Sequence, residues 1–239
     1  MSDELLAVED LHVYYGSAHV LQGIGLSHRG GVLGLLGRNG MGKTTLARAI
    51  MGLVPVHAGE VRVGGTAITN RPPYRVALQG VGYVPQGRDI FPSLSVAEHL
   101  RMLSGRRRGG GGWTTDGVYE MFPRLKERRD VSAGYLSGGE QQMLAIGRAL
   151  LTNPKLLIMD EPSEGLAPVI VDPLIEKLRT LADSGMAILL IEQNLRMATA
   201  VADELLIVSA GRIVSSVAPK ELEGDAALQH ELLGVTMKG

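Results

Sequence analysis

The feature that most constrains this chain is a glycine-rich stretch at residues 37–44. It reads Gly-Arg-Asn-Gly-Met-Gly-Lys-Thr, in which a glycine and four further residues precede Gly-Lys-Thr. The apolar run at 32–36 comes before it and is typical of a strand buried on both faces. A helix is expected after it, from about 44 to 51, and Gly52 is placed to end that helix. A strand, this spacing and a helix in that order predict a phosphate-binding P-loop.

The chemistry of a P-loop explains why these residue types are needed. Glycines let successive backbone N–H groups turn toward phosphate oxygens, and the helix start directs its positive dipole end at the same anion. Lys43 would neutralise the β and γ phosphates, and the Thr44 hydroxyl would bind Mg²⁺. A helix-capping turn would explain the glycines but not Lys43, and a dinucleotide site needs another glycine spacing. The predicted nucleoside triphosphate site comprises Gly37, Arg38, Asn39, Gly40, Met41, Gly42, Lys43, Thr44 and Thr45.

Two adjacent carboxylates follow a second apolar run, at residues 156–159. They are Asp160 and Glu161, and Pro162 prevents the strand from continuing. Because ligands gather at the carboxyl ends of parallel strands, both side chains should face the P-loop. Asp160 is then the expected partner of Mg²⁺, and Glu161 the base that accepts a proton from an attacking water. Two solvated charges at a strand end are the alternative, which the P-loop makes less attractive.

A third segment, Leu-Ser-Gly-Gly-Glu-Gln-Gln at 136–142, precedes a strongly helical stretch. Ser137 and Glu140 form the pattern of a capping box, and capping of a helix N-terminus would by itself explain both residue types. It does not explain Gly138 and Gly139, because each glycine in a helix costs about 1 kcal/mol relative to alanine. Two residues without side chains at a helix start make sense if a phosphate must approach the backbone closely.

The remaining pattern predicts an α/β protein. Alternating apolar residues at 5–13 and 19–26 predict antiparallel strands, and Gly64-Gly65 predicts a hairpin turn. Residues 95–151 are mainly helical, with a mobile loop expected at 109–112. Strands at 156–159 and 187–191 and a hairpin at 205–217 around Ala210-Gly211 alternate with helices. We therefore expect one domain over 1–239, in which an α/β core with an antiparallel β part (1–94 and 152–239) receives a helical subdomain (95–151).

Composition excludes several classes of function. The chain has no cysteine, which rules out thiolate metal sites and cysteine nucleophiles. Its 24 basic and 25 acidic residues give no global electrostatic case for binding nucleic acid. No stretch approaches the roughly 18 apolar residues of a membrane-spanning helix, and the acidic N-terminus is unlike a secretion signal.

Taken together, these motifs resemble those of the nucleotide-binding subunit of an ATP-binding cassette (ABC) transporter. The resemblance extends over about residues 5–217 and adds Tyr15, at the position of the family's adenine-stacking aromatic, and Gln86, at the position of its Q-loop glutamine. The family fold is a P-loop NTPase (RecA-like) core with a parallel sheet. The sequence at 82–88, 160–168 and 191–194 is similar to that of the second ATPase of branched-chain amino acid importers, and urea or amide importers share much of it.

In this family the segment that corresponds to residues 136–141 is the signature. The resemblance implies that ATP, with Mg²⁺ held by Thr44, Gln86 and Asp160, lies between the P-loop of one cassette and the signature of another. Ser137, Gly138, Gly139 and Glu140 would then contact nucleotide bound to a second ATPase, in a homodimer or a heterodimer with a sister cassette. Glu161, Gln86 and Gln193 would act in hydrolysis. Gln193 stands where most cassettes have a histidine; glutamine can hydrogen-bond to phosphate or water but does not become a cation.

Membrane permease subunits, and indirectly a solute-binding protein, are the partners that the resemblance implies, with the chain peripheral on the cytoplasmic side of the cell membrane. A cassette serving an exporter with a separate permease is the alternative left open. A soluble P-loop kinase or GTPase would have no signature segment. A nucleic-acid cassette would need a coiled coil, a cysteine-bound zinc or a second cassette.

Overall fold

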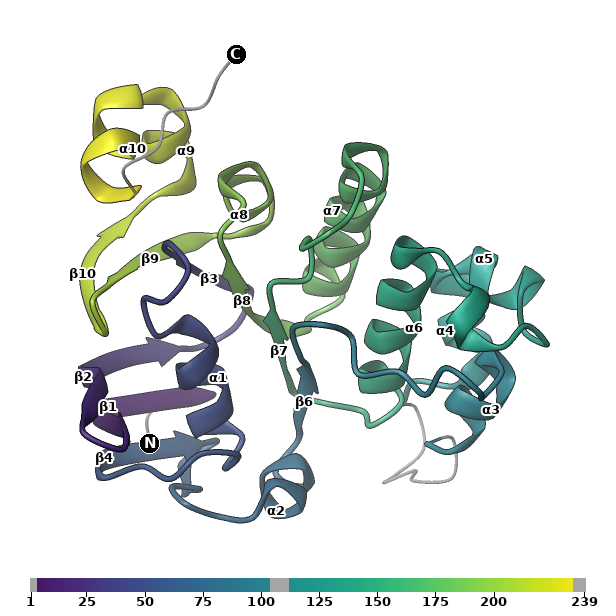
Figure 1. Cartoon of the computed structure of the whole chain (residues 1–239), viewed down its shortest axis with the longest axis horizontal. Coiled ribbons are helices and arrows are strands. Elements are labelled where there is room, and N and C mark those ends of the chain that lie inside the picture. Colours follow the sequence, from purple (N-terminus) through teal and green to yellow (C-terminus); the bar gives the residue numbers. More distant parts are fainter. Residues whose placement is uncertain (1–3, 104–111, 234–239) are drawn as a thin grey trace.

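The computed structural model describes residues 4–103 and 112–233, so most of the expected loop at 109–112 lies outside it. Two sheets organise this part of the chain (Figure 1). The larger one has six strands in the order β10-β9-β3-β8-β7-β6, of which β9, β3, β8, β7 and β6 run parallel while β10 pairs antiparallel with β9. Its strands are β3 (Val32–Leu36), β6 (Val81–Val84), β7 (Leu156–Asp160), β8 (Ala187–Glu192), β9 (Glu204–Ser209) and β10 (Arg212–Val217).

The second sheet has four strands in the order β2-β1-β4-β5, with the three pairings antiparallel as expected. Gly64 and Gly65 connect β4 to β5 with positive φ values of 54° and 76°, a turn conformation that glycine adopts at little cost. The strands of this sheet are β1 (Leu6–Tyr15), β2 (Ala18–His28), β4 (Ala58–Val63) and β5 (Thr66–Ala67).

The six-stranded sheet separates two hydrophobic cores. Side chains alternate across a strand, so Val32 and Leu36 of β3 enter one core while Leu33 and Leu35 enter the other. The first core contains apolar side chains of α6 (Gly138–Leu150), α7 (Pro168–Asp183) and α8 (Leu195–Val201). The second contains those of α1 (Lys43–Ile50) and of the antiparallel sheet. All five residues of β3 are therefore buried, as the apolar run predicts.

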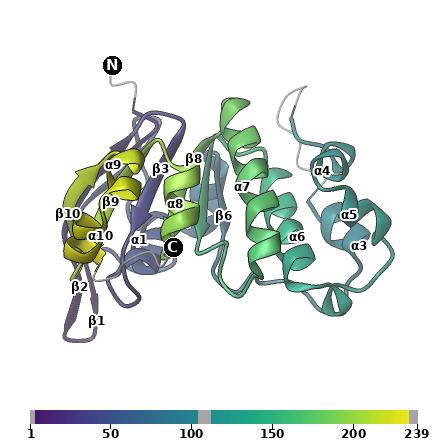
Figure 2. The same ribbon diagram turned by 90° about the horizontal axis from the view of Figure 1, so that it is seen from above.

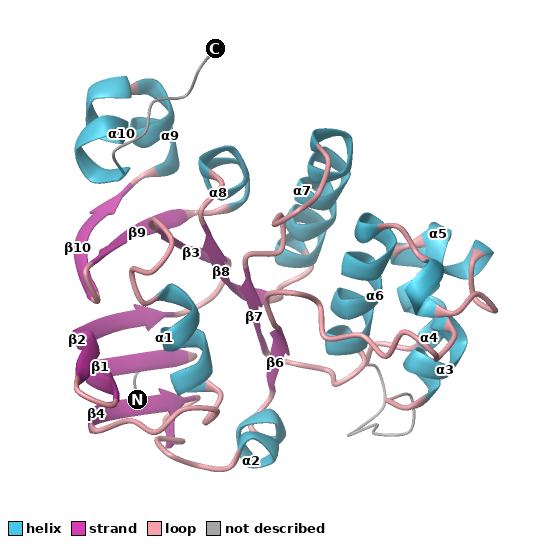
Figure 3. Ribbon diagram, viewed as in Figure 1, coloured by secondary structure: helices cyan, strands magenta, loops and turns pink. Residues whose placement is uncertain are grey.

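The helical stretch between β6 and β7 lies at the opposite end of the molecule from β1 and β2 (Figures 1 and 2). Its expected helical character is confirmed, and Figure 3 shows it as cyan helices joined by loops. Ser95 and Glu98 form a capping box at the start of its first helix. Its elements are α3 (Val96–Arg101), α4 (Thr115–Met121), α5 (Pro123–Glu127), the 3₁₀ helix η1 (Ala133–Tyr135) and α6.

Three further helices, α2 (Pro73–Leu78), α9 (Pro219–Gly224) and α10 (Ala226–Leu233), complete the described chain. Over 4–103 and 112–233 the structure contains no helix of the length and apolarity that crossing a bilayer requires. The predicted α/β architecture, with an antiparallel β part and inserted helices, is confirmed.

Candidate functional site

The glycine-rich turn connects β3 to α1, as the sequence predicts. Gly42 occupies the N-cap position of α1 in the left-handed conformation, with φ of 99°. A Cβ added to it would lie 2.9 Å from Leu21 and 3.2 Å from the carbonyl oxygen of Val20, so the turn packs too closely on β2 for a side chain. Gly40, with φ of 79°, has open space around it. Backbone conformation favours glycine at both positions, and at Gly42 the close approach of β2 adds to that requirement.

A cavity of about 460 Å³ opens beside this turn. It collects residues from four places in the sequence: β2, the P-loop with the start of α1, the loop after β6, and the end of β7. Its volume is in the range of cofactor and ligand sites. The cavity is lined by Val20, Asn39, Gly40, Gly42, Lys43, Thr44, Thr45, Gln86 and Glu161.

Lys43 and Glu161 form an ion pair at this cavity, with 3.1 Å between Lys43 Nζ and Glu161 Oε1. Their side chains are only 3% and 7% exposed. Lys43 Nζ also donates hydrogen bonds to the carbonyl oxygens of Gly37, at 2.8 Å, and Arg38, at 3.1 Å. The ammonium group predicted to meet phosphate is therefore held by the carboxylate predicted to activate water.

Thr44 and Asp160 form a second polar pair in this region. Thr44 Oγ1 donates to Asp160 Oδ1 at 3.0 Å, and the Tyr83 hydroxyl donates to Asp160 Oδ2 at 3.3 Å. Asp160 is fully buried, and burial raises the pKa of its carboxyl while the hydrogen bonds from Thr44 and Tyr83 oppose that shift. The hydroxyl and the carboxylate predicted to hold a metal ion are thus adjacent.

Glu161 has an unusual backbone conformation. Its φ is 49°, in the left-handed region that non-glycine residues seldom adopt, and such strain persists only where surrounding contacts enforce it. Its N–H donates to the carbonyl oxygen of Ile191, at 2.8 Å, in the neighbouring strand β8. The chain therefore turns sharply after Asp160, which places the two consecutive carboxylates in different surroundings.

The other predicted residues lie outside this polar cluster. Gln86 reaches the cavity, but its Nε2 donates to Glu164 Oε2 at 3.0 Å. Tyr15 ends β1 and is 45% exposed, and Gln193 is exposed directly after β8. Neither residue lines the cavity.

Residues 137–140 do not line the cavity either. Ser137 caps α6: its Oγ accepts the N–H of Glu140 at 3.3 Å, and Glu140 Oε2 accepts the N–H of Ser137 at 2.8 Å. The capping box is confirmed. Arg88 packs against this helix start, donating to Gln141 Oε1 at 3.1 Å and to the carbonyl oxygen of Glu164 at 3.3 Å.

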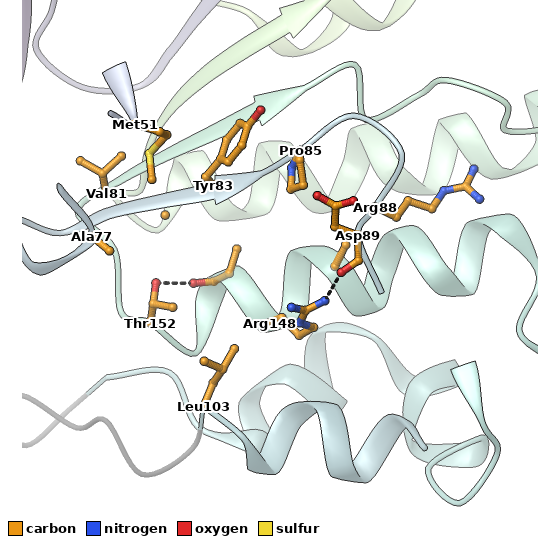
Figure 4. Close-up of a pocket in the computed structure, with 13 residues that line it drawn as sticks. Met51, Ala77, Val81, Tyr83, Pro85, Arg88, Asp89, Leu103, Arg148 and Thr152 are labelled. Atoms are coloured by element: carbon orange, nitrogen blue, oxygen red, sulfur yellow. Dashed lines mark hydrogen bonds between the residues drawn. The ribbon is translucent and has the colours of Figure 1, made fainter. Parts of the chain in front are cut away.

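A second cavity, of about 330 Å³, lies between β6 with α2 on one side and α6 on the other (Figure 4). Ala77 and Val81 contribute apolar surface, while Arg148 donates to the carbonyl oxygen of Asp89 at 2.7 Å. The cavity sits where the inserted helices meet the parallel sheet. It is separate from the P-loop cavity, with which it shares no lining residue.

The sequence model of the ABC transporter family matches residues 22–164, which carry the P-loop and the two carboxylates. The chain belongs to the ABC transporter family. It is an ATP-binding subunit of a transporter of this family, and an ATPase.

Individual relatives agree with this assignment. The high-affinity branched-chain amino acid transport ATP-binding protein BraG of Pseudomonas aeruginosa is 39% identical over 220 residues, covering 88% of this chain and 91% of BraG. The lipopolysaccharide export system ATP-binding protein LptB of Escherichia coli K12 is 33% identical, covering 96% of this chain and 97% of LptB. The crystal structure of the ADP conformation of the cassette MJ1267 has a TM-score of 0.80 at 27% identity, covering 96% of each chain.

Sequence reasoning missed several residues of this cassette's site. Val20 contributes an apolar wall, Tyr83 binds Asp160, and Glu164 binds Gln86. Glu192 was also missed, although it ends the buried strand β8 as Asp160 ends β7. The rule that polar residues gather at the carboxyl ends of parallel strands could have found Glu192.

Proposed function

We propose that this ATPase powers the import of branched-chain amino acids. The convergence of Lys43, Thr44, Gln86 and Glu161 on one cavity supports the proposed hydrolytic site. The importer assignment is supported by BraG, a branched-chain amino acid transport protein that is 39% identical over most of both chains. The second candidate is export, by an ATPase that serves a separate permease. It is supported by LptB, a lipopolysaccharide export protein that is 33% identical to this chain.

The contacts of Lys43 suggest how nucleotide binding prepares the site. The phosphates of ATP are polyanionic and bind Lys43 in place of Glu161, which leaves Glu161 without its cationic partner. Glu161 then accepts the proton of the attacking water, a role that contributes about 10²–10⁴-fold in rate for a positioned base. Gln86 leaves Glu164, and Gln193 donates a hydrogen bond to the γ-phosphate or the water. The exposed Tyr15 stacks on adenine.

The oxygen atoms of Thr44, which lines the cavity, and of Asp160, which contacts Thr44, fit a magnesium ion. Thr44 Oγ1 and Asp160 Oδ1 are 3.0 Å apart, and Mg²⁺ is held in nucleotide sites by one or two protein oxygens together with phosphates and water. Thr44, Asp160 and Gln86 are the proposed ligands. Bound there, the ion would neutralise phosphate charge.

A second cassette completes the site in this proposal. The start of α6 presents backbone N–H groups and a dipole suited to an anion, yet it stands outside the cavity formed by the chain's own P-loop. Ser137, Gly138, Gly139 and Glu140 therefore contact ATP bound to the other cassette, which is a second copy or a sister chain. Closure of the dimer on ATP, and opening after phosphate release, drive transport.

The cavity of Figure 4 is the proposed contact for the membrane permease. It lies between the sheet that binds ATP and the helices that carry residues 137–140, so a permease segment seated there would move with both. The chain acts at the cytoplasmic surface of the membrane, and a solute-binding protein delivers the substrate to the permease. Ala77→Glu, on the exposed face of α2, should release the permease while ATP turnover by the isolated chain persists.

Three measurements test this function. Phosphate release from ATP should fall about 10²–10⁴-fold in Glu161→Gln. Co-purification of the tagged chain from membranes should bring its permease, and reconstituted vesicles should accumulate leucine, isoleucine or valine when ATP is supplied. Unchanged turnover in Glu161→Gln would remove Glu161 from the base role, and an exporter permease in the purified complex would replace the importer assignment.

A further inference from the structure

Glu192, the last residue of β8, is a buried carboxylate with an unusual set of partners. It is 1% exposed, and within the described residues it has no ion pair. Backbone N–H groups donate to both of its oxygens: Ser163 to Oε1 at 3.0 Å, and Gln193 and Asn194 to Oε2 at 3.1 and 3.0 Å. The Ser163 side chain also hydrogen-bonds to this carboxylate. A buried carboxylate is costly unless its oxygens are satisfied, and here both oxygens are.

The two oxygens divide their partners between two loops. Oε1 binds the loop after β7, which begins with Glu161, whereas Oε2 binds the loop after β8, which begins with Gln193. The strands β7 and β8 are parallel neighbours, so both loops begin at the carboxyl-terminal end of the sheet (Figure 1). One side chain therefore connects the segment of the proposed base to the segment of the proposed phosphate-contacting glutamine.

The same strand also holds the strained residue between these contacts. The N–H of Glu161 donates to the carbonyl oxygen of Ile191, and two residues later the N–H of Ser163 donates to Glu192. Two hydrogen bonds to consecutive residues of β8 thus hold the segment in which Glu161 has its positive φ. Strain of this kind is maintained only when its surroundings impose it.

We infer that Glu192 is a positioning residue for ATP hydrolysis, whose carboxylate fixes Glu161 and Gln193 relative to each other. This inference rests on the proposed roles of those two residues. Glu192 does not line the nucleotide cavity, so it acts through the loops that it joins. Three backbone N–H groups and the Ser163 side chain surround the carboxylate, so both of its oxygens are used as acceptors; burial raises the pKa of the Glu192 carboxyl, and these hydrogen bonds oppose that shift.

Glu192→Gln tests the bridge with almost no change in volume. The amide has one acceptor oxygen, so in either orientation its NH₂ group faces the N–H donors of one loop. We expect kcat to fall about 10- to 100-fold, because misplacement of catalytic groups by about 1 Å can cost 10²-fold in rate. Affinity for ATP should change less than about threefold, because the P-loop contacts are untouched. Glu192→Asp keeps the charge but is shorter, and should restore part of kcat.

Amide hydrogen exchange provides a readout that is independent of turnover. In Glu192→Gln the peptides covering 161–166 and 191–196 should both exchange faster, because the bridge serves both loops. Asp203→Asn is the control: Asp203 Oδ2 also accepts a backbone N–H, that of Val32 at 2.7 Å, at the opposite end of the parallel strands, and its Oδ1, in a half-exposed side chain, pairs with Arg179 at 3.0 Å. This control should lower stability while leaving kcat and both peptides unchanged.

The outcomes separate this inference from the proposed function. A wild-type kcat in Glu192→Gln would overturn the positioning role alone. So would a loss of kcat in Glu192→Gln that comes with an equal loss of ATP affinity and with an equal loss of kcat in Asp203→Asn. Faster exchange in only one loop would also overturn it. If Glu161→Gln turns over at the wild-type rate, the proposed base fails, whatever Glu192→Gln does.

Discussion

The ion pair between Lys43 and Glu161 should compete with ATP. Both side chains are almost fully buried at 3.1 Å separation, and phosphate must displace Glu161 to reach Lys43. Lys43 keeps its charge in Glu161→Gln, so a hydrogen bond between two charged groups, at the upper end of about 1.5–3 kcal/mol, is replaced by one in which only the donor is charged, at the lower end of that range. The difference, about 1–1.5 kcal/mol, corresponds to roughly 5- to 12-fold tighter ATP binding. Repulsion between Glu161 and the phosphates adds to this effect in the same direction.

Isothermal titration calorimetry at 25 °C, with a chelator present to prevent turnover, measures the affinity directly. Glu161→Ala removes the competing acceptor completely and should bind ATP more tightly than Glu161→Gln. Glu60→Gln is the control, because Glu60 forms an exposed ion pair with Arg62 at 2.6 Å and lies on β4. Equal dissociation constants for the wild type, Glu161→Gln and Glu161→Ala would refute the competition between the carboxylate and ATP.

Three further predictions concern binding and stability. Lys43→Ala should abolish detectable ATP binding in the same titration, and retained affinity would place the phosphates elsewhere. Burial lowers the pKa of His28, whose Nε2 has no hydrogen-bond partner among the described residues. The unfolded chain therefore binds the proton more readily, and stability should fall as pH drops below about 6.5. Melting temperatures from pH 7.5 to about 5 should fall less steeply in His28→Gln, and parallel slopes would exclude His28 as the cause. Gly211→Ala should cost about 2–3 kcal/mol in urea unfolding, because φ is 76° and a Cβ would lie 2.1 Å from the Val20 carbonyl oxygen; Gly224→Ala, which has open space, should be neutral.

Much of the fold follows from local patterns. The apolar runs at 32–36 and 156–159 predict buried parallel strands, and the structure has β3 and β7 there. Short elements escaped prediction: α2 has only six residues, Pro73–Leu78, and depends on a proline start and on packing against β6. Such elements are stabilised by tertiary contacts rather than by a long periodic pattern.

The candidate site divides in the same way. Lys43, Thr44, Asp160 and Glu161 could be predicted because a phosphate site requires fixed spacing and strand ends. The pairing of Lys43 with Glu161 could not, because 118 positions separate the two residues and no local pattern carries their contact. Glu192 differs: its place at a strand end could have marked it, but its contacts could not be predicted, because they are made largely with backbone N–H groups, which residue types do not reveal.

The alternation of β3 side chains between two cores has a consequence for how such a subunit can diversify. Substitutions in the core shared with α6, α7 and α8 need no compensation in the core beneath the antiparallel sheet, because the six-stranded sheet lies between them. The helices that face the second cavity can therefore be exchanged for those of a relative while the nucleotide side keeps its packing. A chimera carrying residues 95–151 of such a relative would test whether these residues determine the permease with which the subunit assembles.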